Sequence, residues 1–254
     1  MENFDEILNQ MRDESGDLKP NMHLLDEIVP VEEQIRYFKY SKYIQAEKNK
    51  AEADKEELIC KLFATNIDVE DKRHFLTQLA AITDVAAYRA IETYHKNPLE
   101  KELAHWSALA LIESRILLNT ELSGEKQFFV STGLGGKNGK LRYFSVVATE
   151  SREDFNDFQR ETILRELQFA FEQNKIEVES IDIKGNYLKL FVLCGLDHDP
   201  RSSIDDAIKE ANLLGNFIDQ KYLLTNIKLL DDKEIVDLLQ RKETIQGHQD
   251  EDKL

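Results

Sequence analysis

The sequence predicts an α+β protein in which an antiparallel helical region is followed by a region of strands and helices. Apolar residues recur at helical spacing from about Val31 to Leu118. After Ser123-Gly124 the period becomes strand-like, and two strand–helix–strand units follow in series. With 254 residues, the chain is long enough to bury a core without disulfide bonds, in one large domain or in two.

The N-terminal region is predicted in two parts. Residues 1–30 combine acids with one glycine and two prolines, which indicates a short helix and a mobile acidic arm. A helical domain over 31–122 follows. Its polar, glycine-free run Ala46–Glu57 belongs either to one long solvated helix or to two helices joined near Asn49.

Three amphipathic segments between Glu70 and Leu118 carry the strongest helical pattern of the chain. The breaks at Thr83-Asp84 and Asn97-Pro98 are short, which implies antiparallel packing of the helices that they join. Asp84 and Asn97 suit helix caps, and Pro98 suits a first helical turn.

Positions in these segments follow the spacing of stacked helical hairpins, namely Arg73, Leu76, Leu79, Asp84, Ala87, Ile91, Ala104, Ala108 and Leu109. Over about fifty residues this pattern resembles HEAT-type repeats. The resemblance implies a protein-binding scaffold, because such repeats present extended helical surfaces to partners. The alternative is a generic helical bundle.

The C-terminal region, 125–242, is predicted to fold as an α/β domain. Its strands are expected at 127–132, 141–149, 176–183, 187–195 and 222–230, and its helices at 153–173, 202–219 and 232–241. Asn138-Gly139 indicates a hairpin between the first two strands. The tail over 243–254 is polar and is predicted to be disordered.

The two strand–helix–strand units superimpose without a gap when Leu141 is placed on Leu188. The resulting β-α-β-β-α-β order resembles the ferredoxin-like α/β sandwich, with an extra N-terminal strand and a C-terminal helix. The most apolar segments, Ser145–Val147 and Val192–Cys194, are expected in two central, parallel strands.

The extra strand near Gln127 competes for a sheet edge, so a five-stranded sheet with helices on one face is expected. A second fold hypothesis is the helix-and-twisted-sheet form of bacterial secretion chaperones, which are also small and acidic.

Composition favours a cytoplasmic protein. Forty-nine acidic residues against thirty-three basic ones give a formal charge of −16, which repels nucleic acid and anionic lipid, so neither a nucleic acid nor a membrane is expected as a partner. No run is apolar and long enough for a membrane span, and no secretory signal is recognised. Cys60 and Cys194 lie in apolar runs and are expected to be buried thiols.

The glycine-rich loop 133–140 is the first candidate binding site. Gly135 and Gly136 could let backbone amides approach an anion, and Lys137 and Lys140 could contact it. The Walker pattern fails, because Leu134 stands where glycine is required and a strand follows. A flexible hairpin is the favoured interpretation.

The second candidate site is one end of the predicted sheet. Asp197, His198, Asp199 and Arg201 follow a central strand and open a helix, and the duplication puts Glu150 and Arg152 at the same end. A carboxylate beside a histidine suits a general base or a metal ligand pair. The favoured interpretation is that Asp199 caps the helix that begins near Pro200.

No catalytic residue, metal ligand set or cofactor motif is identified. Trp106 and the series Tyr37, Tyr40 and Tyr43 are expected to pack against the fold, with partner anchoring as the alternative. The sequence therefore predicts a non-enzymatic interaction or adaptor protein that binds a protein partner. The alternatives are a ligand sensor or enzyme that uses the Glu150/Asp197–Arg201 end of the sheet, and a protein similar to secretion chaperones.

Overall fold

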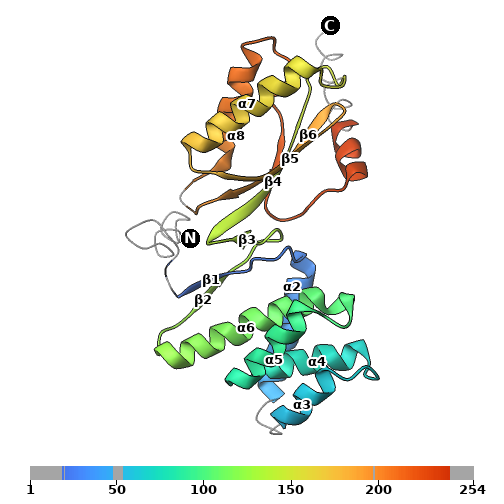
Figure 1. Cartoon of the computed structure of the whole chain (residues 1–254), viewed down its shortest axis with the longest axis vertical. Helices are drawn as coiled ribbons and strands as arrows, with labels where there is room; N and C mark the ends of the chain where they lie inside the picture. The colour runs from blue at the N-terminus through green and yellow to red at the C-terminus, as the bar shows by residue number, and fades with distance from the viewer. Residues whose placement is uncertain (1–18, 20, 48–53, 197, 241–254) are drawn as a thin grey trace, which may run out of the picture. The chain divides into compact units, whose positions relative to one another are not determined.

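The computed structural model describes residue 19 and residues 21–47, 54–196 and 198–240. They divide into two compact units. The first is formed by the chain up to Arg142 together with the separate segment Leu193–His198, and the second by Tyr143–Val192 together with the chain from Asp199 onward. Both helix and sheet are present, so the α+β class is confirmed (Figure 1). Among the residues described, no helix is both long and apolar enough to cross a bilayer.

The described residues of the helical unit form the helices α2 (Val31–Glu47), α3 (Lys55–Leu62), α4 (Val69–Ala80), α5 (Val85–Lys96) and α6 (Ala104–Ser123) and the short 3-10 helix η1 (Lys101–Leu103). The predicted cap at Asp84 is confirmed, since its side chain accepts hydrogen bonds from the backbone N–H groups of Ala86 and Ala87. Asn97 is also a cap, at the C-terminal end of α5, where its backbone N–H donates to Tyr94 O. The expectation that Pro98 opens a helix is wrong, because the next helical turn, η1, begins only at Lys101.

Helix α6 is the centre of this unit. Its residues from Trp106 to Ser114 are all buried, and it contacts α2, α4 and α5. A helix that is apolar on every side requires neighbours on every side, which explains why the surrounding helices pack around it. Gly124 ends α6 with a left-handed φ of 68°, so the change of pattern predicted at Ser123-Gly124 is confirmed.

Two short strands form a separate parallel pair, β1 (Met22–Leu24) and β2 (Phe128–Val130). The expectation of a mobile arm is therefore corrected for its last residues, which form β1 and bury Leu25 and Val29 in the core. Burial of these apolar side chains repays the entropy lost in ordering the segment. The predicted boundaries of the helical domain (31–122), the α/β domain (125–242) and the tail (243–254) remain predictions.

The five-stranded sheet has the order β3-β4-β6-β5, and β7 also pairs with β4. Its elements are β3 (Gly136–Lys137), β4 (Lys140–Ala148), β5 (Glu177–Lys184), β6 (Tyr187–Cys194) and β7 (Leu223–Thr225), with α7 (Asp157–Gln173) and α8 (Pro200–Asn212). Helices α7 and α8 pack against each other beside the sheet (Figure 1). The predicted pairing of β4 with the strand near Gln127 is wrong, because β2 pairs with β1 and the hairpin partner of β4 is β3.

The central strands β4 and β6 run antiparallel, not parallel as predicted. Thr149 N donates to Asn186 O at 2.9 Å, which puts the end of β4 beside the start of β6. The reason is connectivity: α7 returns the chain so that β5 runs in the direction of β4, and the turn at Gly185 then reverses it into β6. The resemblance to the ferredoxin-like arrangement stays a prediction.

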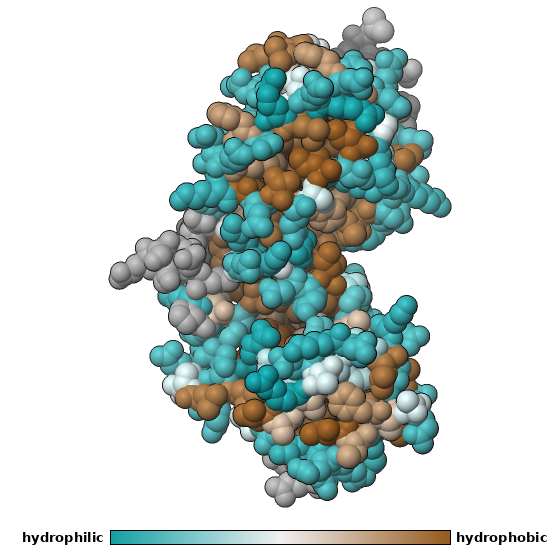
Figure 2. Space-filling view, viewed as in Figure 1, coloured by the Kyte–Doolittle hydropathy of each residue, from teal (hydrophilic) through white to brown (hydrophobic). Residues whose placement is uncertain are grey.

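Two further expectations are corrected. Helix α8 ends at Asn212 instead of continuing to Asp219, because Ile218 pairs with Thr149 as an isolated β-bridge. Cys194 is buried as predicted, whereas Cys60 is exposed, since it lies on the outer side of α3. Hydrophilic side chains cover most of the face in Figure 2, as the high content of charged residues requires.

Candidate functional site

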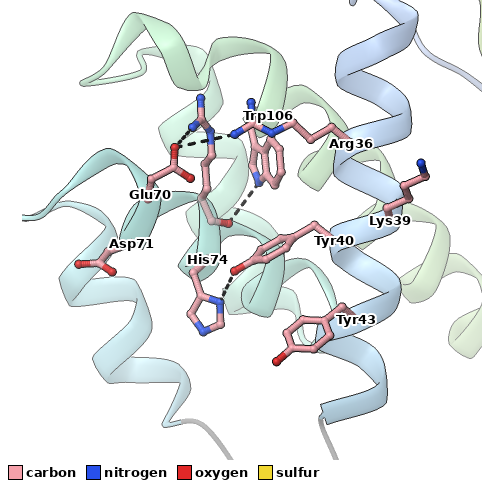
Figure 3. Close-up of a pocket in the computed structure, with 9 residues that line it drawn as sticks. Arg36, Lys39, Tyr40, Tyr43, Glu70, Asp71, His74 and Trp106 are labelled. Carbon is pink, nitrogen blue, oxygen red and sulfur yellow. Dashed lines mark hydrogen bonds and ion pairs between the residues drawn. The ribbon is translucent and has the colours of Figure 1, made fainter.

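The candidate site is a hollow of about 600 Å³ in the helical unit. Its walls come from α2, α4 and the start of α6, and they are lined by Arg36, Lys39, Tyr40, Tyr43, Glu70, Asp71, Arg73, His74 and Trp106 (Figure 3). Ligand pockets in proteins commonly measure about 300 to 1,000 Å³, so the hollow is large enough for a small molecule.

Helix α2 supplies one polar and aromatic face. Arg36, Lys39, Tyr40 and Tyr43 stand at positions i, i+3, i+4 and i+7, which lie on one side of a helix. The other side of α2 is fixed to α6 by Glu113, a buried carboxylate that accepts hydrogen bonds from Tyr37, Ser41 and Gln45 at 2.5, 2.5 and 2.7 Å. The burial of Tyr37 and its nearby Glu113 carboxylate raise the pKa of the Tyr37 phenol.

Trp106 forms the back wall. The residue is only 3% exposed, and its indole N–H donates to the Thr77 hydroxyl at 3.0 Å and to the Arg73 carbonyl at 3.2 Å. The guanidinium carbons of Arg36 and Arg73 both lie 5.5 Å from the ring centroid, within the range of cation–π attraction. Trp106 therefore holds two positive charges at the pocket.

Glu70 sits between these two cations. It forms an ion pair with Nη1 of Arg73, and one of its oxygens lies 3.8 Å from Nη2 of Arg36 (Figure 3). The Glu70 side chain is 68% exposed, so water screens these contacts. The Nε of Arg73 is buried and finds no hydrogen-bond partner in the part of the chain that the structure describes.

The tyrosines form the aromatic side of the hollow. The Tyr40 hydroxyl lies 2.7 Å from Nδ1 of His74, and its ring stacks on that of Tyr43 with centroids 6.4 Å apart. Burial raises the pKa of Tyr40, and the nearby carboxylates act in the same direction. Tyr43 is 59% exposed, which corrects the expectation that all these aromatic residues are packed; Tyr37 and Trp106 are buried as predicted.

The glycine-rich loop is a structural junction. Gly135 and Gly136 are buried, and a Cβ on Gly135 would collide with the backbone of Asp26 and Glu27. Lys137 is exposed, and Lys140 opposes it across the β3–β4 pair. The glycines thus allow close backbone packing, and the binding of an anion by this loop stays a prediction.

The two groups of the second predicted site do not meet. Asn186 Nδ2 donates to Arg152 O at 3.0 Å, so Glu150 and Arg152 lie beside the turn that starts β6. From there β6 leads about 25 Å away before the chain reaches Asp199. The prediction of a shared sheet end is wrong because it assumed parallel strands. Arg152 instead pairs with the buried Asp219 at 2.6 Å.

Asp199 has the predicted structural role. Its carboxylate accepts the backbone N–H of Arg201 at 2.9 Å, and Pro200 occupies the first turn of α8. His198 and Arg201 are exposed, and Asp197 lies outside the described residues. Within the described ranges, no three His, Cys, Asp or Glu side chains gather as a metal site would require.

The structure brings together a histidine, a glutamate and a serine that the sequence analysis did not predict as a group. His95 lies 2.9 Å from Glu27 through Nε2 and 3.1 Å from the Ser107 hydroxyl through Nδ1. This order resembles a hydrolase triad, but Ser107 is fully buried and donates to the carbonyl of Ala104. A nucleophile must reach its substrate, so this network is structural. The hydrogen bond from His95 lowers the pKa of Glu27.

Comparison with known proteins finds only weak structural similarity. No family model matches the chain, and no curated protein matches it. A solved structure described as a transposase candidate from Deinococcus radiodurans R1 is 15% identical over 41% of this chain and 90% of its own, with a TM-score of 0.33. The REP-associated tyrosine transposase bound to a REP hairpin is 12% identical over 37% of this chain and 60% of its own, with a TM-score of 0.32.

These comparisons correct the predicted function. Both structures are described as transposases, and neither is described as an adaptor, a scaffold or a secretion chaperone. The prediction of a non-enzymatic adaptor is wrong on this finding. At such low TM-scores the similarity does not carry the activity of those proteins to this chain.

Proposed function

We propose that the helical unit binds a nucleotide unit, meaning a phosphate joined to a planar base, in the hollow between α2 and α4. The observation that carries this proposal is the pair of guanidinium groups, Arg36 and Arg73, held against Trp106 next to the exposed ring of Tyr43.

The cationic side of the hollow suits the phosphate. Three cationic side chains, Arg36, Lys39 and Arg73, face two carboxylates, Glu70 and Asp71, so the lining is net positive on a chain with a net charge of −16. Guanidinium groups bind phosphate oxygens through paired hydrogen bonds and are less strongly hydrated than ammonium groups.

The aromatic side suits the base. Tyr43 offers an exposed ring that is supported from behind by Tyr40, so it is available for stacking. Stacking of a base on an aromatic side chain contributes roughly 1 to 3 kcal/mol. A ligand that combines an anion and a planar ring therefore uses both sides of the hollow.

The charge of the whole protein favours a small ligand over a long polyanion. A local positive pocket attracts a single phosphate group at close range, whereas a long duplex would meet the excess of carboxylates on the rest of the surface. We therefore propose a mononucleotide or the end of a single strand as the ligand, and not a duplex.

Calorimetric titration tests the proposal with four probes: a nucleoside monophosphate, a short single-stranded oligonucleotide, the free nucleoside and inorganic phosphate. We expect the first probe to bind more tightly than either of its halves. Trp106 is the only tryptophan, so its fluorescence provides a second readout at the pocket. The oligonucleotide distinguishes a strand end from a free nucleotide.

The variant Arg36→Gln should weaken nucleotide binding by about tenfold or more, because a charge-assisted hydrogen bond contributes roughly 1.5 to 3 kcal/mol. Arg89→Gln is the matched control, since Arg89 is an exposed arginine of the same unit that pairs with Glu92 and does not line the hollow. Equal affinity of the two variants for the nucleotide, or no binding to the wild type, would refute the proposal.

A further inference from the structure

Glu70 occupies the position that the anion of a ligand would take. Its carboxylate contacts both guanidinium groups of the pocket, yet its side chain is 68% exposed and is free to rotate into water. A phosphate that binds Arg36 and Arg73 must therefore displace a carboxylate that the protein itself supplies.

We propose that Glu70 acts as a built-in competitor that restricts the pocket to phosphate monoesters, the group at a mononucleotide or at the end of a strand. This inference rests on the proposed function and names the anion that the site selects.

Charge gives the first reason. A phosphate diester carries one negative charge, as the carboxylate of Glu70 does, so exchanging one for the other changes the attraction to the two cations little. A phosphate monoester carries nearly two charges at neutral pH, because its second pKa is about 6. Only the monoester gains substantially by displacing Glu70.

Hydrogen bonding gives the second reason. A carboxylate has two acceptor oxygens, and a diester has two that are not bridging, whereas a terminal phosphate has three. The Nε of Arg73 is buried beside the pair with Glu70 and is without a hydrogen-bond partner among the described residues. Once Glu70 has left, a third phosphate oxygen can accept this N–H.

A nucleoside 5′-monophosphate and the 3′,5′-cyclic monophosphate of the same base test the inference, because they differ in the ester and share the base. We expect the wild type to bind the monoester at least about tenfold more tightly at pH 7.5. Lowering the pH to 5.5 should reduce this preference severalfold, since the monoester becomes a monoanion.

The charged and titratable side chains that line the hollow with Glu70 are Arg36, Lys39, Tyr40 and Tyr43 from α2 and Asp71, Arg73 and His74 from α4. Protonation of any of them acts on both ligands. The cyclic ligand therefore reports their effect separately from the titration of the phosphate.

Glu70→Gln should tighten binding of both ligands severalfold and by a similar factor, because each displaces the same carboxylate, and the weakly bound cyclic ligand should thereby become readily measurable. Asp71→Asn is the matched control: it removes the same charge from the same wall, but Asp71 forms no ion pair with either arginine in the described chain. It should strengthen binding of the cyclic ligand less than Glu70→Gln does, because no carboxylate has to leave the two arginines on its account.

The outcomes separate the two proposals. If the wild type binds both ligands equally, or if Glu70→Gln strengthens binding of the cyclic ligand no more than Asp71→Asn does, the role of Glu70 is refuted and the proposed function stands. If the wild type binds neither ligand, both are refuted. Circular dichroism spectra check that each variant is folded, and Glu70→Ala is a second substitution in case Glu70→Gln does not fold. The comparison of the two ligands on the wild type does not depend on any variant.

Discussion

Asp199 and Asp206 lie on the same helix and carry the same charge, but only Asp199 caps it. Asp199→Ala should lower the free energy of unfolding by about 0.5 to 2 kcal/mol, because the first turn of α8 loses an acceptor for its backbone N–H groups. Asp206→Ala is the control and should change stability much less. Urea denaturation measures both variants.

An equal loss in the free energy of unfolding for the two variants would mean that charge, not capping, explains the effect. Loss of nucleotide binding in Asp199→Ala, in a protein of unchanged stability, would instead make this residue part of a ligand site.

The structural roles of single residues were predicted better from the sequence than the relations between elements. Asp84 and Asp199 were identified as caps because a cap is defined by its own residue type and the few residues that follow. The exposure of Tyr43 was not predicted, since helical spacing alone does not tell which face of α2 the rest of the chain covers.

At the scale of elements, Gly135 joins the β3 hairpin to the segment after β1. Its φ is 62°, and an added Cβ would collide with backbone oxygen atoms of Asp26 and Glu27. Gly135→Ala should therefore cost more than the roughly 1 to 2 kcal/mol of a left-handed alanine alone. Gly124→Ala provides that reference, because Gly124 has a φ of 68° and nothing within 4 Å of its Cβ position.

Thermal or urea unfolding of the two glycine variants gives the comparison. Equal destabilisation would show that the segment Asp26–Glu27 moves aside, and the account of this loop as a rigid junction would then be wrong.

The position of most elements followed from periodicity, but their relations did not. Strands β4 and β6 are both largely buried and apolar, and an apolar run looks the same whichever way its strand runs. The sequence pattern therefore could not reveal that the two strands are antiparallel. The candidate pocket was missed for a similar reason. Its cations lie on α2 and α4, which are separated in the chain by α3, and only the packing on Trp106 brings them together.

At the scale of the whole molecule, a fragment over residues 124–242 tests the predicted boundary. We expect it to unfold cooperatively, because β4, β5, β6, β7, α7 and α8 all lie within it. Backbone amides of Phe128–Val130 should exchange quickly in the fragment, since their partner strand Met22–Leu24 is absent. Hydrogen exchange followed by mass spectrometry measures both.

A fragment without cooperative unfolding would show that the C-terminal region needs the helical unit to complete its core. Slow exchange at Phe128–Val130 would show that β2 is ordered by something other than β1.

Composition and pattern were sufficient for the α+β class, because it depends only on which periods occur and in what order. They were insufficient for the β1–β2 pair, whose hydrogen bond from Phe128 N to Asn21 O joins residues that are far apart in the chain. No local pattern marks a three-residue strand at Met22–Leu24, and its partner is chosen only in the folded protein.

The same pair constrains how the protein emerges from the ribosome. Met22–Leu24 is made early, but its partner ends at Val130, about a hundred residues later. At translation rates of roughly 5 to 20 residues per second, the first strand waits on the order of 5 to 20 seconds for its partner. Meanwhile the intervening helices, which depend on contacts nearer in sequence, can already assemble. Pairing of β1 with β2 is therefore a late step in the biogenesis of the helical unit.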